Sequence, residues 1–393
     1  MSAAACSIPV TGRLPQVRLA AVALALAVLG GLLAWRAAGE RQLALYGVGL
    51  LLGLSLYHAS FGFTSAWRRL VVEGDGRGLR AQLVMLAVAV LLFFPALAEG
   101  ELFGRPVSGF VAPAGTSVAI GAFLFGLGMQ LGGGCASGTL YAVGGGSTRM
   151  IVTLFFFILG SVIATAHLPF WHSLPALEPF SFVEALGLLP ALVLHLGLFA
   201  LIFALSLLVE RRRHGHILEN PRLAWHPLRG PWPIWAGAVA LALLNFATLA
   251  LAGRPWGITS AFALWGAKLF DAVGIGVREW EWWRNQQTLL ELDLWQDITS
   301  VMDFGIMIGA FLAASLAGEF RPGWRVPPRV LLAAALGGLL LGYGARLAFG
   351  CNIGAYFSGI ASGSLHGWLW PVAALAGTAV GVRLRPRFGL SNP

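Results

Sequence analysis

Two cysteines hold the same position in two glycine-rich segments of similar sequence. Cys135 lies in GLGMQLGGGCASGTLYAVGGG (126–146), and Cys351 lies 216 residues later in GYGARLAFGCNIGAYFSGIAS (342–362). A thiol offers a weak S–H donor and a polarizable acceptor to a passing solute. One thiol in each copy of a duplicated membrane element therefore predicts a two-sided pathway.

Other roles for the two cysteines fit their surroundings less well. A lone thiol in a membrane helix commonly packs as a small buried apolar group. A disulfide between Cys135 and Cys351 is disfavoured if the two thiols enter from opposite faces. A metal site would need further Cys or His residues at ligand spacing, which neither segment provides. We expect no metal and no cofactor, and we assign no role to Cys6 in the N-terminal tail.

Glycines beside the cysteines, among them Gly134 and Gly350, break the helical pattern in each segment. Peptide groups that such a break leaves unpaired cannot face lipid, so they belong inside the protein or beside water. Half-helices that begin at the breaks would point free N–H groups and positive dipole ends at the pathway, which suits an anion. The alternative is that the glycines serve only close helix packing.

A second pair of matched segments precedes the cysteine segments in each half of the chain. FGFTSA (61–66) resembles WGITSA (256–261), and each follows an apolar stretch. Their hydroxyl groups would add donors at the same kind of helix break. The predicted pathway residues in these segments are Thr64, Ser65, Thr259 and Ser260.

Two basic residues lie in or beside apolar stretches, where an unpaired charge is costly and a functional role is the default hypothesis. Arg346 matches Gln130 in the other copy and lies five residues before Cys351. We expect it to face the pathway and attract the anion; the alternative is a structural ion pair with Asp303 or Glu319. Lys268, the only lysine, follows WGITSA and either serves the pathway or extends to the membrane surface.

The composition requires that these segments lie in a membrane. Hydrophobic residues make up 58% of the 393 residues and charged residues 11%, which a water-facing globule cannot accommodate. The net charge of +9 comes from arginines in loops, which favours the lipid bilayer as partner and excludes nucleic acid. Ten candidate spans, each near the roughly 20 residues that cross a bilayer, lie at about 17–37, 43–60, 81–98, 116–133, 150–168, 184–209, 232–252, 302–318, 329–349 and 367–384.

Arginine placement orients the spans. Three loops are rich in arginine and should be cytoplasmic, which also places both termini in the cytoplasm. Each half reads span, Thr-Ser motif, two spans, cysteine segment and span, while the span at 184–209 separates the halves. One extra crossing inverts the second half, so Cys135 and Cys351 approach the midplane from opposite faces. The predicted divisions are an N-terminal tail and first span (1–42), a first repeat (43–168), a connecting span with a basic loop (169–231) and an inverted repeat (232–393).

The two cysteine segments also resemble a known family. GGGCASG (132–138) and FGCNIGAYFSGIASGS (349–364), in two duplicated membrane halves, resemble the YeeE/YedE sulphur-transport family of bacterial inner-membrane thiosulfate importers. The resemblance covers roughly residues 43–384. It implies uptake of thiosulfate or a related anion along an hourglass-shaped path, with Cys135 and Cys351 making successive S–H···S contacts. Such importers generally carry a further pore cysteine near the start of a half, and FGFTSA and WGITSA have none.

The sequence thus predicts an all-α polytopic protein of the cell inner membrane, with about ten spans in two inverted-topology repeats and short re-entrant Gly-rich Cys segments. The predicted function is import of thiosulfate or a related small sulphur-containing anion, with a cytoplasmic sulphur-acceptor protein as a further partner. We do not expect an enzyme. The alternatives are a membrane-embedded thiol enzyme that handles persulfide sulphur and a non-transporting membrane partner subunit. The enzyme would require an activated thiolate with a base in reach.

Overall fold

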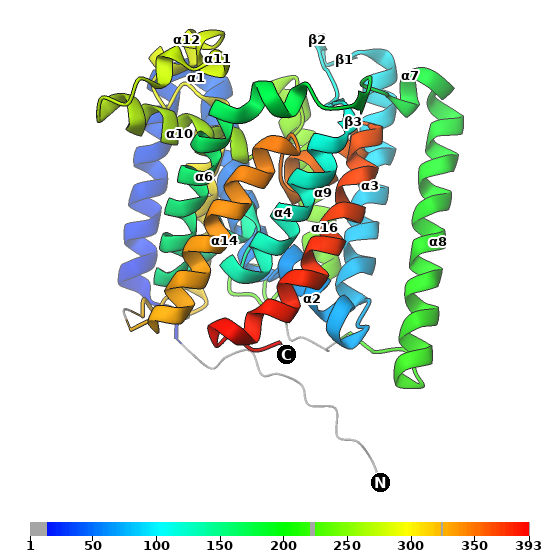
Figure 1. The fold of residues 1–393 in the computed structure, drawn as a ribbon. Helices are drawn as coiled ribbons and strands as arrows, with labels where there is room; N and C mark the ends of the chain where they lie inside the picture. The colour runs from blue at the N-terminus through cyan, green and yellow to red at the C-terminus, as the bar shows by residue number, and fades with distance from the viewer. Residues whose placement is uncertain (1–13, 221–224, 324, 393) are drawn as a thin grey trace.

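Long apolar helices dominate the fold (Figure 1). The computed structural model describes residues 14–220, 225–323 and 325–392. Within these residues, nine helical stretches are long and apolar enough to cross a membrane. The long helices are α1 (Val17–His58), α3 (Arg77–Glu99), α4 (Thr116–Gly132), α6 (Thr148–His172), α8 (Leu188–His214), α9 (Ile234–Ala252), α13 (Ile298–Leu316), α14 (Pro328–Leu347) and α16 (Leu365–Leu384).

Short elements connect the long helices, and the strands are limited to two-residue pairs. β1 (Glu101–Leu102) pairs with β2 (Arg105–Pro106), and β3 (Ala114–Gly115) pairs with β4 (Ala176–Leu177), both antiparallel. The short helices are α2 (Phe63–Glu73), α5 (Ala136–Gly144), α7 (Phe182–Leu186), α10 (Thr259–Ala272), η1 (Val277–Glu279), α11 (Glu281–Arg284), α12 (Gln287–Glu291), the π-helix η2 (Asn352–Phe357), α15 (Ser358–Ala361) and η3 (Arg385–Phe388). The predicted all-α membrane class is confirmed.

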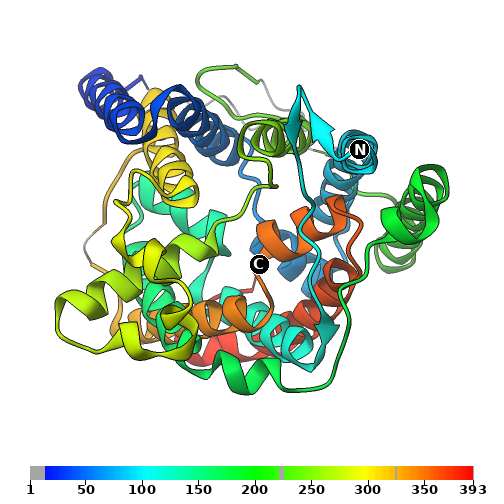
Figure 2. The ribbon, with the colours of Figure 1, turned by 90° about the horizontal axis from the view of Figure 1, so that it is seen from above.

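Helix α1 folds back on itself and supplies two of the ten predicted spans. Ala38 and Gly39 have non-helical backbone angles, and the positive φ of 77° at Gly39 favours glycine. The Tyr46 hydroxyl donates to the carbonyl of Leu26, 20 residues away in sequence. In one straight helix these residues would lie about 30 Å apart. Figure 2 shows the two halves of α1 side by side (dark blue).

The bundle has two distinct ends (Figure 1). The C-terminus, α2 and the last turn of α8 lie at one end, which we call the C-terminal end; α10, α11, α12 and the strands lie at the opposite end. Arg77 at the start of α3 and the run Arg211–Arg213 in the last turn of α8 therefore share the C-terminal end. This grouping agrees with the arginine-based orientation, in which these loops face one compartment.

Helices α4 and α14 pack through glycines in a reciprocal way. A Cβ on Gly121 would lie 2.7 Å from the carbonyl oxygen of Gly344, and a Cβ on Gly337 would lie 2.8 Å from that of Gly128. Adding 216 to 121 gives 337, and subtracting 216 from 344 gives 128, so the repeat register exchanges the two contacts. Such self-complementary contacts are typical of copies related by a two-fold axis.

The neighbouring helix pairs follow the same rule. Gly160 of α6 packs on the carbonyl of Leu339 in α14, while Gly377 of α16 packs on the carbonyl of Phe123 in α4. Gly160 and Gly377 are 217 residues apart, and Phe123 and Leu339 are 216 apart, so each contact again has a counterpart in the other half. This packing supports the inverted repeat, which stays a prediction.

Helix α8 lies at the periphery of the bundle (green, Figures 1 and 2). It is joined to α3 at the C-terminal end by an ion pair of 2.9 Å between Arg80 and the fully buried Glu210. The same carboxylate accepts a hydrogen bond from the backbone N–H of Gly76. This peripheral position fits the predicted role of a connecting span outside the two repeats.

Candidate functional site

Each cysteine begins a short helix in the interior of the bundle. Cys135 is the N-cap of α5 and Cys351 is the N-cap of η2, with φ/ψ of −81°/−167° and −104°/−165°. The Cys135 sulfur accepts a hydrogen bond of 3.4 Å from the N–H of Gly138, and the Cys351 sulfur accepts one of 3.4 Å from the N–H of Ile353. Both thiols are free and buried. The two sulfur atoms thus cap their helices in similar but not identical ways. We call the turn and short helix at each cysteine, residues 133–144 and 349–361, the two cysteine hairpins.

A left-handed turn precedes each cysteine at the matched position. Gly133 has φ of 93° and Phe349 has φ of 56°. A bulky residue with positive φ is strained and persists where its surroundings hold it. The Phe349 ring stacks on His172, with ring centroids 5.4 Å apart and planes inclined by 12°. The nine-residue α5 that follows the first turn is about 14 Å long, too short to cross a bilayer.

A pocket of about 290 Å³ collects several predicted site residues near the end of the bundle that holds α10. We call it the Arg254–Arg346 pocket. Two guanidinium groups, four hydroxyl side chains and the backbone of the second cysteine hairpin line it, a chemistry that suits a small anion. The predicted residues in its lining are Thr259, Ser260, Arg346 and Gly350.

Arg346 forms no ion pair among the described residues, and its Nε is buried without a hydrogen-bond partner. The alternative of a structural pair with Asp303 or Glu319 is therefore wrong. Both carboxyl oxygens of Asp303 are likewise buried without a partner. The charge of Arg346 remains available to a solute in the pocket.

Arg254 is a pocket residue that the sequence interpretation missed. Its Nη2 donates to the Thr299 hydroxyl at 3.1 Å, and the Ser260 hydroxyl donates to the same oxygen at 3.2 Å. The only local signal was its place two residues before WGITSA. It is held where it adds a second positive charge to the pocket opposite Arg346.

The Thr-Ser pair of the first half lies toward the C-terminal end. The Gln130 amide donates to the backbone carbonyl of Thr64 at 3.1 Å, and the Thr64 hydroxyl is buried without a partner. Ser65 lines a separate pocket of about 440 Å³ together with Asp75. Burial raises the pKa of Asp75, but the hydrogen bonds and charge of Arg77 outweigh it and hold the pKa below its ordinary value. Thr64 and Ser65 thus face different surroundings.

Three arginines, also missed from the sequence, surround the end of α4 just before Cys135. We call Arg68, Arg149 and Arg385 the Arg68 cluster. Arg149 donates to the carbonyl of Leu131 at 2.7 Å, and Arg385 donates to the carbonyl of Gln130 at 2.6 Å. The guanidinium groups of the cluster repel one another, and the Nε atoms of Arg68 and Arg149 are buried without partners. The cluster gives the C-terminal end a positive potential beside Gly134.

Lys268, another predicted pathway residue, does not line the pocket. Its ammonium group donates to the carbonyl of Leu290 in α12 at 2.8 Å. The amine thereby fastens α10 to the short helices that cover the end of the bundle. A structural role in this cover accounts for the side chain without a solute.

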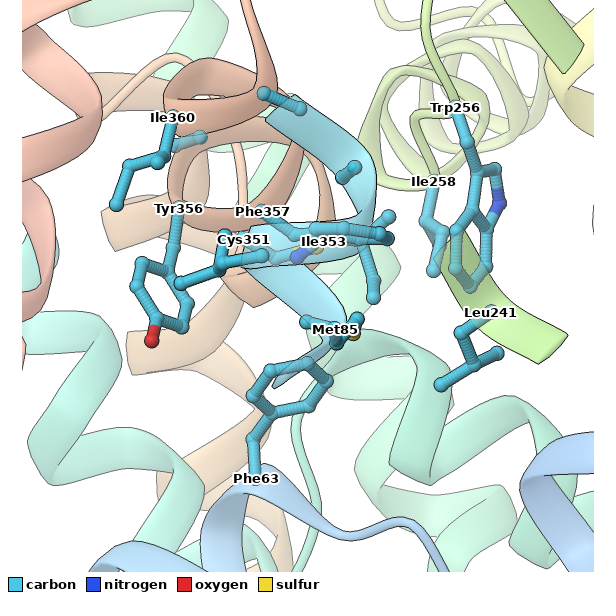
Figure 3. Close-up of a cluster of buried hydrophobic side chains, with 14 of the residues drawn as sticks. Phe63, Met85, Leu241, Trp256, Ile258, Cys351, Ile353, Tyr356, Phe357 and Ile360 are labelled. Carbon is cyan, nitrogen blue, oxygen red and sulfur yellow. The ribbon is translucent and has the colours of Figure 1, made fainter. Parts of the chain in front are cut away.

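An apolar cluster surrounds Cys351. Figure 3 shows Cys351 among Ile353, Tyr356 and Phe357, with Phe63 of α2 facing the same group. The ring centroids of Phe63 and Tyr356 are 6.2 Å apart in an edge-on arrangement. This packing leaves Cys351 with no exposed surface.

Comparison with known proteins identifies the family. A family described as sulphur transport matches residues 58–380. The thiosulfate transporter TsuA of Spirochaeta thermophila is 28% identical over 341 residues, covering 84% of this chain and 94% of that protein. TsuA of Escherichia coli is 28% identical over 348 residues, covering 84% and 90%, and the probable transporter YedE of Escherichia coli is 32% identical over 168 residues, covering 41% of each chain. The chain belongs to the sulphur-transport family.

Proposed function

We propose that this protein imports thiosulfate or a related small sulphur-containing anion across the cell inner membrane, with Cys135 and Cys351 as successive relay thiols. The observation that carries the proposal is the Arg254–Arg346 pocket, whose lining includes Gly350 directly before Cys351. The similarity to proteins named thiosulfate transporters supports the same substrate class.

The pathway begins at the Arg254–Arg346 pocket. Two guanidinium groups and the hydroxyls of Thr259 and Ser260 replace part of the water around an entering anion. Replacement is needed because an ion without partners in a low-dielectric bundle costs several kcal/mol. Binding here concentrates the anion beside the second hairpin.

The thiols carry the next step. A thiol is a weak donor, and its polarizable sulfur suits a sulphur-containing anion. Weak contacts at successive sites let an ion enter and leave, whereas one strong site would retain it. The anion passes from Cys351 to Cys135 and then toward the Arg68 cluster, whose positive potential favours its arrival at the cytoplasmic side. The inverted repeats supply one hairpin from each face of the membrane.

Orientation and partners complete the proposal. The arginine-rich C-terminal end faces the cytoplasm, in accordance with the bias of basic loops. An anion released there would be available to a cytoplasmic sulphur-acceptor protein. Thr64, Ser65 and Gly134 lie on this half of the pathway, and Lys268 stabilises the outer cover.

The thiol-enzyme alternative is disfavoured by the surroundings of the sulfurs. Among the described residues, the Cys135 sulfur contacts the Ser137 hydroxyl at 3.4 Å and one backbone N–H, and the Cys351 sulfur contacts one backbone N–H. Neither sulfur has a histidine or carboxylate base within hydrogen-bond distance there. A thiolate nucleophile normally depends on such a neighbour or on a positively charged one.

The test is uptake of labelled thiosulfate into vesicles that contain only this protein. Uptake above that of empty vesicles, with competition by unlabelled thiosulfate, supports self-sufficient transport. No uptake in either vesicle orientation would contradict the proposal and favour the partner-subunit alternative. Sulfate serves as the matched competitor, because it has a similar charge and lacks the terminal sulphur atom; strong competition by sulfate would argue against selection by thiols.

A further inference from the structure

Asp303 is a buried acid that the proposed relay does not use. It lies in α13 with no exposed surface, and neither carboxyl oxygen has a hydrogen-bond partner among the described residues. An ionised carboxylate without partners in a membrane interior is very unfavourable. The group therefore rests in its protonated form or meets water or a solute during the transport cycle.

The position of Asp303 on α13 places it along the pathway. Thr299, one turn earlier on the same face, accepts hydrogen bonds from Arg254 and Ser260 of the Arg254–Arg346 pocket. Asp303 lies about 6 Å deeper along the helix. One further turn on, the carbonyl of Met307 packs against Gly144 at the end of α5. This face of α13 runs from the pocket to the Cys135 hairpin.

The packing of α13 on α1 fixes the side of the helix on which Asp303 lies. A different side of α13 packs on α1, where Gly49 lies on the carbonyl of Met302 and Gly53 lies on that of Ile306. Asp303 therefore lies away from the centre of the contact with α1.

The charged groups around Asp303 make no ion pair with it among the described residues. Asp297 is the N-cap of α13, and Arg254 donates to Thr299, one turn before Asp303. On α10, Lys268 is bound to Leu290, and Asp271 is paired with Arg278. The titratable residues on the faces of α5 and α1 that pack on α13 are tyrosines: Tyr141, Tyr46 and Tyr57. The other titratable residues of α1 lie near its turn or its ends: Arg18, Arg36, Glu40, Arg41 and His58. The described ion pairs do not include Asp303.

The membrane potential opposes the import of an anion, and a side chain that carries a proton inward with the anion reduces this cost. The potential across an energised inner membrane is negative inside, so each negative charge that moves inward works against it. A proton that moves with the anion cancels one charge and also follows its own gradient. A protonated carboxyl beside the path adds an O–H donor for the anion, whereas a carboxylate would repel it.

We propose that Asp303 carries a proton with the anion, so that this protein is a proton-coupled symporter. The inference rests on the proposed function. Asp303 takes a proton from the outer water when the Arg254–Arg346 pocket is open, donates a hydrogen bond to the passing anion, and releases the proton to cytoplasmic water after the anion has left. One proton and one anion move inward per cycle, and the carboxyl group returns to its starting form.

The test uses proteoliposomes with a pH-sensitive dye trapped inside and the membrane potential clamped at zero. Adding thiosulfate outside should acidify the lumen in vesicles with the wild-type protein. D303N should still exchange labelled for unlabelled thiosulfate, because the amide mimics the protonated acid, but its rate of acidification should fall by at least about tenfold, since an amide releases no proton. D303E should retain acidification. D271N, the same chemical change in a partly exposed pair with Arg278, should behave like the wild type.

The outcomes separate this inference from the proposed function. Wild-type uptake of thiosulfate without acidification would overturn proton coupling and leave transport intact, whereas no wild-type uptake would overturn the proposed function itself. Acidification that persists in D303N would overturn the assignment to Asp303. If D303N loses exchange, the D303E variant is the deciding measurement. Acidification that D303E retains supports the carrier role of Asp303. Loss of acidification in D303E, with or without exchange, overturns that role.

Discussion

At the residue scale, the most informative atoms are polar side-chain atoms that are buried without hydrogen-bond partners. Buried polar groups are normally hydrogen-bonded, so each exception requires an explanation. The exceptions here include Arg346, which lines the Arg254–Arg346 pocket, and also Thr64 and Asp303. In the proposed pathway, water or the anion would satisfy these three groups when the pathway opens.

The relay thiols give the first prediction. Replacing Cys351 or Cys135 by alanine should each slow thiosulfate-dependent growth of an importer-deficient host by about fivefold, since one lost hydrogen bond contributes about 1 kcal/mol to each transfer. Cys6→Ala, outside the described residues, is the matched control and should grow like the wild type. Full growth of both pathway variants would remove the thiols from the mechanism.

Arg346 gives the second prediction. Arg346→Gln should raise the KM for thiosulfate uptake by about tenfold or more, because a hydrogen bond to a charged partner contributes about 1.5–3 kcal/mol. The KM of Arg346→Lys should lie between those of the wild type and Arg346→Gln, because lysine keeps the charge and loses the planar fork of the guanidinium group. Arg383→Gln is the control, because Arg383 is exposed and donates to the carbonyl of Ala379 one turn earlier. An unchanged KM in Arg346→Gln would place the anion elsewhere.

At the element scale, glycines decide how closely the helices approach. Membrane helices gain little from apolar burial and associate through close packing, which small residues permit. The exchanged contacts of Gly121 with Gly344 and of Gly337 with Gly128 use this packing twice. In the predicted inverted repeat, the α4–α14 contact would lie on the axis that relates the two halves.

This contact predicts equal effects at matched positions. Gly121→Ala and Gly337→Ala should each lower stability by about 1–3 kcal/mol, because the added methyl group meets backbone atoms that cannot move aside. Gly197→Ala in α8, where an added methyl group meets nothing within 4 Å, should be neutral or stabilising by about 0.5–1 kcal/mol. Thermal unfolding in detergent measures all three. Strongly unequal losses at Gly121 and Gly337 would contradict a symmetric role.

At the scale of the whole molecule, hydropathy, glycine breaks and arginine bias were enough to predict the spans and both cysteine turns, because each depends on local sequence. Phe349 shows the limit: its left-handed backbone matches Gly133, yet a phenylalanine gives no local sign of it. The Arg68 cluster was beyond the sequence because its members come from α2, α6 and η3 and meet only in the fold. The contact of Lys268 with the Leu290 carbonyl was likewise beyond the sequence, since the motif before it did not fix where the side chain points.

Sidedness of the two thiols is the central claim, and labelling measures it most directly. Variants that keep only Cys135 or only Cys351 would be treated with a membrane-impermeant thiol reagent from either face during turnover. The account predicts that Cys351 reacts from the outer face, Cys135 reacts from the cytoplasmic face, and thiosulfate protects both. Reaction of both thiols from one face, or no protection by thiosulfate, would contradict it.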